Sequence, residues 1–219
     1  MTPAPDPSKF PTLQFEQSLW ESGFLCIAGI DEAGRGAWAG PVCAAAVILP
    51  PDDSLLQILK AVRDSKLMTP LARATWAPRI RLAARAWGVG FASALEIDSI
   101  GILPATRLAA TRALSGLSIA PDTLLTDYLV FPNCELPQIA LVKGDRLSLS
   151  VAAASVLAKT ARDALMQELD AQYPGYGFAR HKGYGTLIHQ QAIQQIGLCE
   201  IHRKSFAIPV THPGSPRSS

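Results

Sequence analysis

The chain has 219 residues, of which 48% are hydrophobic and 17% charged, with a formal net charge of +2. This composition is too apolar and too weakly charged for a disordered protein. The longest apolar run, residues 41–49, is about half as long as a membrane-spanning helix. The N-terminal residues lack the apolar core of a signal peptide, and the four cysteines form no CxxC pair. We therefore expect a cytoplasmic protein with free thiols and no membrane association.

The charge is unevenly distributed. Residues 1–139 contain 11 basic and 13 acidic side chains, a net of −2, whereas residues 140–219 contain 9 and 5, a net of +4. A basic C-terminal third is a weak indication of a polyanionic partner, and ordinary surface charge is the alternative.

In chain order, the hydrophobic pattern predicts a short helix (15–23), two strands (24–30 and 42–49), a helix (70–86), a strand (86–95), a helix (99–117), two strands (123–131 and 138–142) and two helices (147–169 and 186–196). This order predicts an α/β fold, with a mixed sheet, helices on both faces and a helical C-terminal extension. The expected divisions are an N-terminal tail with a short helix (1–22), a core (23–170), a helical extension (171–210) and a disordered tail (211–219).

Two adjacent acids, Asp31 and Glu32, come directly after the first predicted strand and precede the turn Gly34-Arg35-Gly36. Most such doublets lie in solvent, but acids at the end of a buried strand bring charge to the rim of a core, which is costly without a cation. The glycines allow a ligand to approach the backbone, or simply form a tight turn. A phosphate-binding P-loop is excluded, because it requires Lys followed by Ser or Thr where this chain has Arg and Gly.

Two further acids stand in apolar surroundings. Asp127 is one charge in an otherwise apolar strand, for which an edge position or a salt bridge is the alternative explanation. Asp163 shares a helix face with Lys159, so a surface ion pair is its alternative. With the first two acids, they predict a four-carboxylate site. Four carboxylates require counter-charge, and Mg²⁺ prefers oxygen ligands. Two such ions about 4 Å apart activate water against a phosphodiester.

The C-terminal third combines aromatic, glycine and basic residues. Residues 173–186 read YPGYGFARHKGYGT, a pattern that suits stacking on bases or sugars with cations on phosphates. A glycine-rich loop with one buried tyrosine is the alternative. Residues 201–206, IHRKSF, form a second basic cluster, which alone is more typical of a solvated surface.

As a set, these segments resemble bacterial ribonuclease HII, the type 2 ribonuclease H family. The resemblance extends from about residue 23 to 206 and is carried by GIDEAGRG (29–36), AGPV (39–42), DSK (64–66), LVKGD (141–145), SVAAASVLAK (150–159), RD (162–163), YPGYGF (173–178), HKGYGT (181–186) and IHRKSF (201–206). The chain departs from the family pattern at Ala37-Trp38, where a Pro is usual, at Tyr128, where a Gly is usual, and at Leu67-Met68, where the usual DSKKL reads DSKLM.

The resemblance implies a ribonuclease H-like five-stranded mixed sheet flanked by helices, and an endonuclease that hydrolyses the RNA strand of RNA–DNA hybrids. It also implies cleavage on the 5′ side of single ribonucleotides in duplex DNA, with 3′-hydroxyl and 5′-phosphate products, as in ribonucleotide excision repair. By resemblance, the ligands of Mg²⁺ or Mn²⁺, two ions at turnover, are Asp31, Glu32, Asp127 and Asp163. The 2′-hydroxyl at the junction would be sensed by Gly34, Arg35, Gly36 and Tyr184.

Phosphate contacts are expected from five basic residues, Lys143, Lys159, Arg162, Lys182 and Arg203. We expect a monomer, because no long amphipathic seam is left unassigned. Two alternatives remain, a hybrid-binding protein without catalysis and a member of the ribonuclease HIII branch, whose chains carry an extra N-terminal substrate-binding domain.

Overall fold

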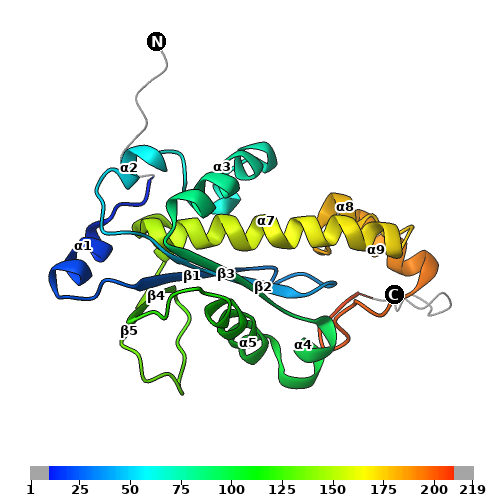
Figure 1. The fold of residues 1–219 in the computed structure, drawn as a ribbon. Coiled ribbons are helices and arrows are strands. Elements are labelled where there is room, and N and C mark those ends of the chain that lie inside the picture. Colours follow the sequence, from blue (N-terminus) through cyan, green and yellow to red (C-terminus); the bar gives the residue numbers. More distant parts are fainter. Residues whose placement is uncertain (1–9, 210–219) are drawn as a thin grey trace, which may run out of the picture.

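A computed structural model describes residues 10–209 and shows one mixed β-sheet between helices (Figure 1). The strands are β1 (Ile27–Ala33), β2 (Val42–Ile48), β3 (Ala86–Ala92), β4 (Thr123–Asp127) and β5 (Gln138–Leu141). Their order is β3-β2-β1-β4-β5. The pairs β1–β2 and β2–β3 are antiparallel, whereas β1–β4 and β4–β5 are parallel. The expected five-stranded mixed sheet is confirmed. The predicted tail, 211–219, lies outside the described residues.

The helices are α1 (Gln14–Glu21), α2 (Leu55–Ile58), α3 (Pro70–Ala83), α4 (Ala94–Ile100), α5 (Ile102–Ser115), α6 (Gly144–Leu147), α7 (Leu149–Gln172), α8 (Phe178–His181) and α9 (Leu187–Ile196), with a 3₁₀ turn at Ser65–Leu67. The long helix α7 covers one face of the sheet and α5 the other (Figure 1). No helix among the described residues is long and apolar enough to cross a membrane.

Strand β2, which lies between β3 and β1, is buried along its whole length, because the two helix layers cover both of its faces. Alternate residues point to opposite sides, so Cys43, Ala45 and Val47 pack toward α7 while Ala44 and Ala46 pack toward α5. On the face that packs against α7, strand β1 and the helix lie close together, because β1 has a glycine, Gly29, at the contact. A Cβ at this position would lie 2.4 Å from the backbone carbon of Ser150.

Several boundaries differ from the sequence-based expectation. The predicted strand 24–30 is observed as Ile27–Ala33, so Asp31 and Glu32 lie within the strand, where they pair with Ala45 and Ala44 of β2. The predicted helix 99–117 is observed as α4 and α5, which are separated at Gly101 with φ 83°. The strand predicted over 123–131 ends at Asp127, because Tyr128 has a left-handed backbone (φ 59°) that leaves the sheet.

The C-terminal segment packs around the distal part of α7. A cluster that includes Met166 of α7, Phe178 of α8 and Ile193 of α9 forms its apolar centre, together with Ala39 from the loop that follows β1. This arrangement brings the loop between β1 and β2 next to residues near position 183, as the hydrogen bonds from the amides of Trp38 and Ala39 to the carbonyl of Gly183 show.

Candidate functional site

The carboxylates of the site lie at the carboxyl ends of neighbouring parallel strands. In the β1–β4 register, Ile30 pairs with Thr126, which places Asp31 and Asp127 level with each other one residue further along. Asp31 is 3% exposed. The carboxylate of Asp127 is held by the amide of Gly144, which donates to Oδ1 at 2.8 Å. The topology of the sheet therefore brings together acids that are far apart in the sequence.

These acids are electrostatically strained. Burial raises the pKa of Asp31 well above its ordinary value, and the nearby charges of Glu32 and Asp127 raise it further. The hydroxyl of Ser155 lowers this pKa and so offsets part of the rise. Burial also raises the pKa of Glu32, although Arg35, at 3.2 Å, acts in the opposite direction. Asp31 Oδ2 and Glu32 Oε2 are buried without a hydrogen-bond partner. Buried, unpartnered carboxylate oxygens of this kind favour a bound cation.

Asp145, which we did not select from the sequence, joins this group. It is 4% exposed and follows Gly144 at the start of α6. Its pKa is raised to about 6 by burial and then by Asp64 and Asp127. A signal was present in the sequence, because LVKGD follows the predicted strand 138–142, whose carboxyl end lies beside that of β4.

Lys66 is a second cation beside these acids, in addition to Arg35. Burial lowers its pKa, but the charges of Asp31, Asp64, Asp145 and Glu32 outweigh that effect, and the pKa is raised overall. Lys66 comes from the 3₁₀ turn Ser65–Leu67, whose position is set by Asp64, since the Asp64 carboxylate accepts from the Lys66 amide at 2.9 Å. One ammonium group is therefore shared among four carboxylates.

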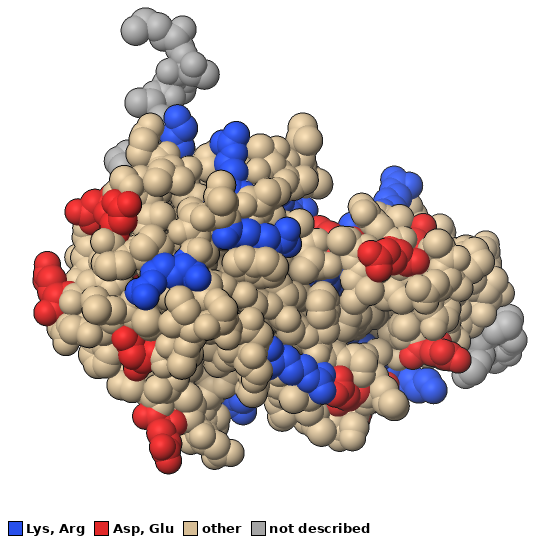
Figure 2. Space-filling view, viewed as in Figure 1, with Lys and Arg blue, Asp and Glu red and all other residues tan. Residues whose placement is uncertain are grey.

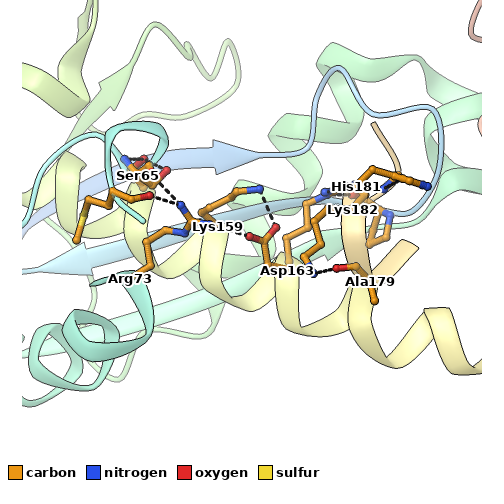
Figure 3. A network of polar contacts seen from close by, with 12 residues as sticks. Ser65, Arg73, Lys159, Asp163, Ala179, His181 and Lys182 are labelled. Atoms are coloured by element: carbon orange, nitrogen blue, oxygen red, sulfur yellow. Dashed lines mark hydrogen bonds and ion pairs between the residues drawn. The ribbon is translucent and has the colours of Figure 1, made fainter. Parts of the chain in front are cut away.

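Asp163 does not join the group. Its Oδ1 accepts from Lys159 Nζ at 2.7 Å and its Oδ2 from Arg73 Nη2 at 3.1 Å (Figure 3). Asp163 also lies two turns beyond Ser155 on α7, a rise of about 12 Å. The structure thus shows the i,i+4 ion pair that was the alternative explanation for Asp163, and Asp145 stands beside Asp127 in its place.

The turn that follows β1 and the predicted sensor tyrosine line one cleft. Its volume is about 530 Å³, and its walls are formed by Glu32, Ala33, Gly34, Arg35, Gly36, Ser65, Lys66, Lys159 and Tyr184. The cationic groups of Lys159 and Arg162 each lie 5.4 Å from the centre of the Tyr184 ring, a cation–π arrangement that fixes the ring. The expected sensor residues and Glu32 therefore meet in one place.

Two of the residues expected to contact phosphate, Arg162 and Arg203, are instead fully buried. The Arg203 guanidinium donates to the carbonyls of Gly34 (2.7 Å), Arg35 (2.8 Å) and Gly40 (3.0 Å). Burial lowers its pKa to about 9, and the nearby charge of Arg162 adds to this. The sequence shows that Arg203 is charged but not which way its side chain points. In the structure the guanidinium points into the protein and binds the backbone carbonyls of the glycine turn.

Arg162 has the same kind of role. Its guanidinium donates to the carbonyls of Pro41 (2.8 Å), Lys182 (2.9 Å) and Ala39 (3.1 Å), and so joins the loop after β1 to the loop that contains Tyr184. Of the other expected phosphate contacts, Lys143 is exposed, while Lys159 and Lys182 are half-buried and remain near the surface.

A chain of buried histidines supports Tyr184. The Cys199 amide donates to His202 Nδ1 at 2.9 Å, His202 Nε2 and His189 Nε2 are 3.0 Å apart, and His189 Nδ1 lies 3.0 Å from the Tyr184 carbonyl. One assignment of protons satisfies all three contacts, with both rings neutral and each donating toward Tyr184. In agreement, burial lowers the pKa of His189 to about 4.

Among residues 10–209, no three His, Cys, Asp or Glu side chains are grouped closely enough to hold a metal ion by themselves. The described cysteines are all free.

Comparison with known proteins is consistent with this geometry. The family model for ribonuclease HII matches residues 28–208. A ribonuclease HII of Thermus thermophilus is 50% identical over 205 residues, which cover 92% of this chain and 97% of that protein. One of Chloroflexus aggregans is 51% identical over 197 residues, which cover 90% of this chain and 93% of that protein.

A solved structure shows the same fold. The ribonuclease H2 of Pyrococcus horikoshii superposes with a TM-score of 0.69 and 26% identity, covering 83% of this chain and 94% of that one. The expected ribonuclease H-like sheet is thereby confirmed. From its sequence and its fold, the chain belongs to the ribonuclease HII family of ribonucleases.

Proposed function

We propose that the chain is an endonuclease that hydrolyses the RNA strand of RNA–DNA hybrids and cuts on the 5′ side of single ribonucleotides embedded in duplex DNA. The products would carry 3′-hydroxyl and 5′-phosphate ends. The observation that carries the proposal is that Asp31 and Glu32 have buried oxygens without partners, and that Glu32 lines one cleft together with Gly34, Arg35, Gly36 and Tyr184. Removal of ribonucleotides from DNA in the cytoplasm would be its role.

The proposed ligands of Mg²⁺ or Mn²⁺ are Asp31, Glu32, Asp127 and Asp145, with Asp145 in place of Asp163. All are oxygen donors, which suits these ions, and the raised pKa values of Asp31, Glu32 and Asp145 would relax when a cation binds. Mg²⁺ is commonly held by one or two carboxylates, with water and phosphate completing its shell. Two bound ions would supply an activated water and stabilise the leaving oxygen.

The selection of ribose would depend on the backbone of the turn. Since N–H and C=O of a trans peptide point in opposite directions, and Arg203 binds the carbonyls of Gly34 and Arg35, the amides of Arg35 and Gly36 point away from Arg203. We propose that these amides face the substrate and meet the 2′-hydroxyl, the group that distinguishes RNA from DNA. Tyr184, held by Lys159, Arg162 and the histidine chain, would pack against the sugar at the junction.

The test is cleavage of three duplexes by the full chain, one all-DNA, one with a single ribonucleotide and one RNA–DNA hybrid, each with and without Mg²⁺ or Mn²⁺. We expect cleavage of the last two with metal only. Asp31→Asn should abolish cleavage while retaining hybrid binding. Normal cleavage by Asp31→Asn, or cutting of the all-DNA duplex at the same rate, would overturn the proposal.

A second comparison tests the choice of the fourth ligand. Asp145→Asn should reduce the cleavage rate at least as strongly as Asp127→Asn, whereas Asp163→Asn, which removes the same charge, should retain most of the rate. A loss confined to Asp163→Asn would restore Asp163 as the ligand.

A further inference from the structure

A second cleft lies beside the first, between α3 and α8 and over α7. Figure 2 shows the surface hollowed where α3 and α8 face each other in Figure 1. The volume of this cleft is about 510 Å³, and its walls include Pro70, Arg73, Thr160, Asp163, Arg180 and Lys182. The mechanism proposed above makes no use of it.

The cleft has an excess of positive charge. Three cationic side chains line it, Arg73, Arg180 and Lys182, against one carboxylate, Asp163, whose two oxygens are already bound by Arg73 and Lys159 (Figure 3). The pKa of Lys182 is lowered mainly by burial and further by the nearby cations Lys159 and Arg162, while Asp163 and Asp170 act in the opposite direction. An anion in the cleft would relieve this crowding of cations.

Two further features favour an anion. Thr160 Oγ1 is buried without a hydrogen-bond partner, which costs free energy unless a ligand supplies the missing hydrogen bond. Pro70, the first residue of the 14-residue helix α3, also lines the cleft, so the helix dipole places partial positive charge nearby, although Pro70 itself has no N–H to donate. Arg73 is held firmly, because Nη1 donates to the carbonyls of Ser65 (2.9 Å) and Met68 (2.6 Å).

The two clefts are joined through one ion pair. Lys159 lines the first cleft, and its partner Asp163 lines the second. Asp163 lies about 12 Å along α7 from Ser155, which neighbours Asp31. A duplex lying along α7, with about 3.4 Å of axis per nucleotide, would span this separation in about three or four nucleotides.

We propose that the second cleft binds one backbone phosphate of the nucleic-acid duplex, about three or four nucleotides from the cleaved bond, through Arg180, Lys182 and Thr160. This proposal rests on the proposed function, because the duplex that supplies the phosphate is the proposed substrate. The site positions the duplex without reading its sequence, because every nucleotide carries the same phosphate.

The experiment measures equilibrium binding of a duplex with one ribonucleotide by fluorescence anisotropy without divalent metal, so that it does not depend on cleavage. The variants are Arg180→Gln and Lys182→Gln, singly and together. Lys60→Gln is the matched control, since it removes the same charge from an exposed position at the end of α2. Each cleft variant should weaken binding several-fold for any sequence and reduce the slope of log affinity against log salt by about 1, while Lys60→Gln leaves both near wild type.

The second arm replaces single phosphates of the duplex by neutral methylphosphonates, one position at a time on each strand. At one position, three or four nucleotides from the ribonucleotide, the substitution should weaken wild-type binding as much as the double variant does and should not weaken the double variant further. Additive losses at every position, or wild-type affinity of the double variant, would overturn the site. Cleavage by the wild type in the parallel assay would then show that the proposed function stands without it.

Discussion

Gly34 allows the sharpest test of how the cleft is built. It has φ +93° and is buried against Arg162, so that an added Cβ would lie 1.9 Å from Nε and 2.5 Å from Cδ of that side chain. Gly36, two residues later in the same turn, has ordinary φ and open space within 4 Å of its Cβ position. Gly34→Ala and Gly36→Ala therefore add the same atom to one turn in two different environments.

The expected cost of Gly34→Ala has two parts. An alanine in the left-handed region costs about 1 kcal/mol. The Cβ also displaces Arg162, whose Nε donates to the Pro41 carbonyl at 2.8 Å, and loss of a charged hydrogen bond costs about 2 kcal/mol. The sum, about 3 kcal/mol, is a large part of the stability of a typical domain. Gly36→Ala should change stability by no more than about 0.5 kcal/mol.

Urea unfolding followed by tryptophan fluorescence and by circular dichroism measures both differences. The slope of the unfolding free energy against urea should be unchanged, which shows that the midpoint shift reports stability. A Gly34→Ala variant within about 1 kcal/mol of wild type, or equal losses for the two variants, would refute the view that Arg162 is fixed against the turn.

Three other outcomes are expected. His189 titrates at about 4 when folded and near 6.5 when unfolded, so the unfolded chain binds this proton first as the pH falls. Its stabilising contribution, complete above pH 6.5, is lost between pH 6.5 and 4 and amounts to about 3 kcal/mol. Urea unfolding at pH 7.5 and 4.5 should show a smaller pH dependence for His189→Gln, and an equal dependence would contradict this. Glu16 Oε1 accepts from the Ser148 hydroxyl at 2.6 Å and from the amide and hydroxyl of Ser150 at 2.8 Å. Glu16→Ala should therefore cost about 3 kcal/mol in the same assay, whereas Glu21→Ala, exposed on the same helix, should cost almost nothing. Tyr184→Ala should slow cleavage at a single ribonucleotide about 10-fold, and wild-type rates would exclude a contact with the junction.

Local signals in the sequence were sufficient for most of the fold. All five strands were predicted, and the apolar run at β2 is continuous because that strand is covered on both faces and needs no alternation. The local signals failed at the ends of elements, where tertiary contacts decide. Strand β1 extends through Asp31 and Glu32, because the alanines of β2 pair with them, and the helix predicted over 99–117 is interrupted at Gly101.

The residue types and motif order of this chain were enough to identify its family, and with it Asp31, Glu32, Asp127, the glycine turn and Tyr184 as candidate site residues. Only the tertiary structure showed that Asp163 is bound by two cations while Asp145 lies beside Asp127, and that Arg162 and Arg203 are buried. The physical reason is that the residue type alone determines which charge a side chain can carry. Its burial and its partners depend on which distant segments pack against it.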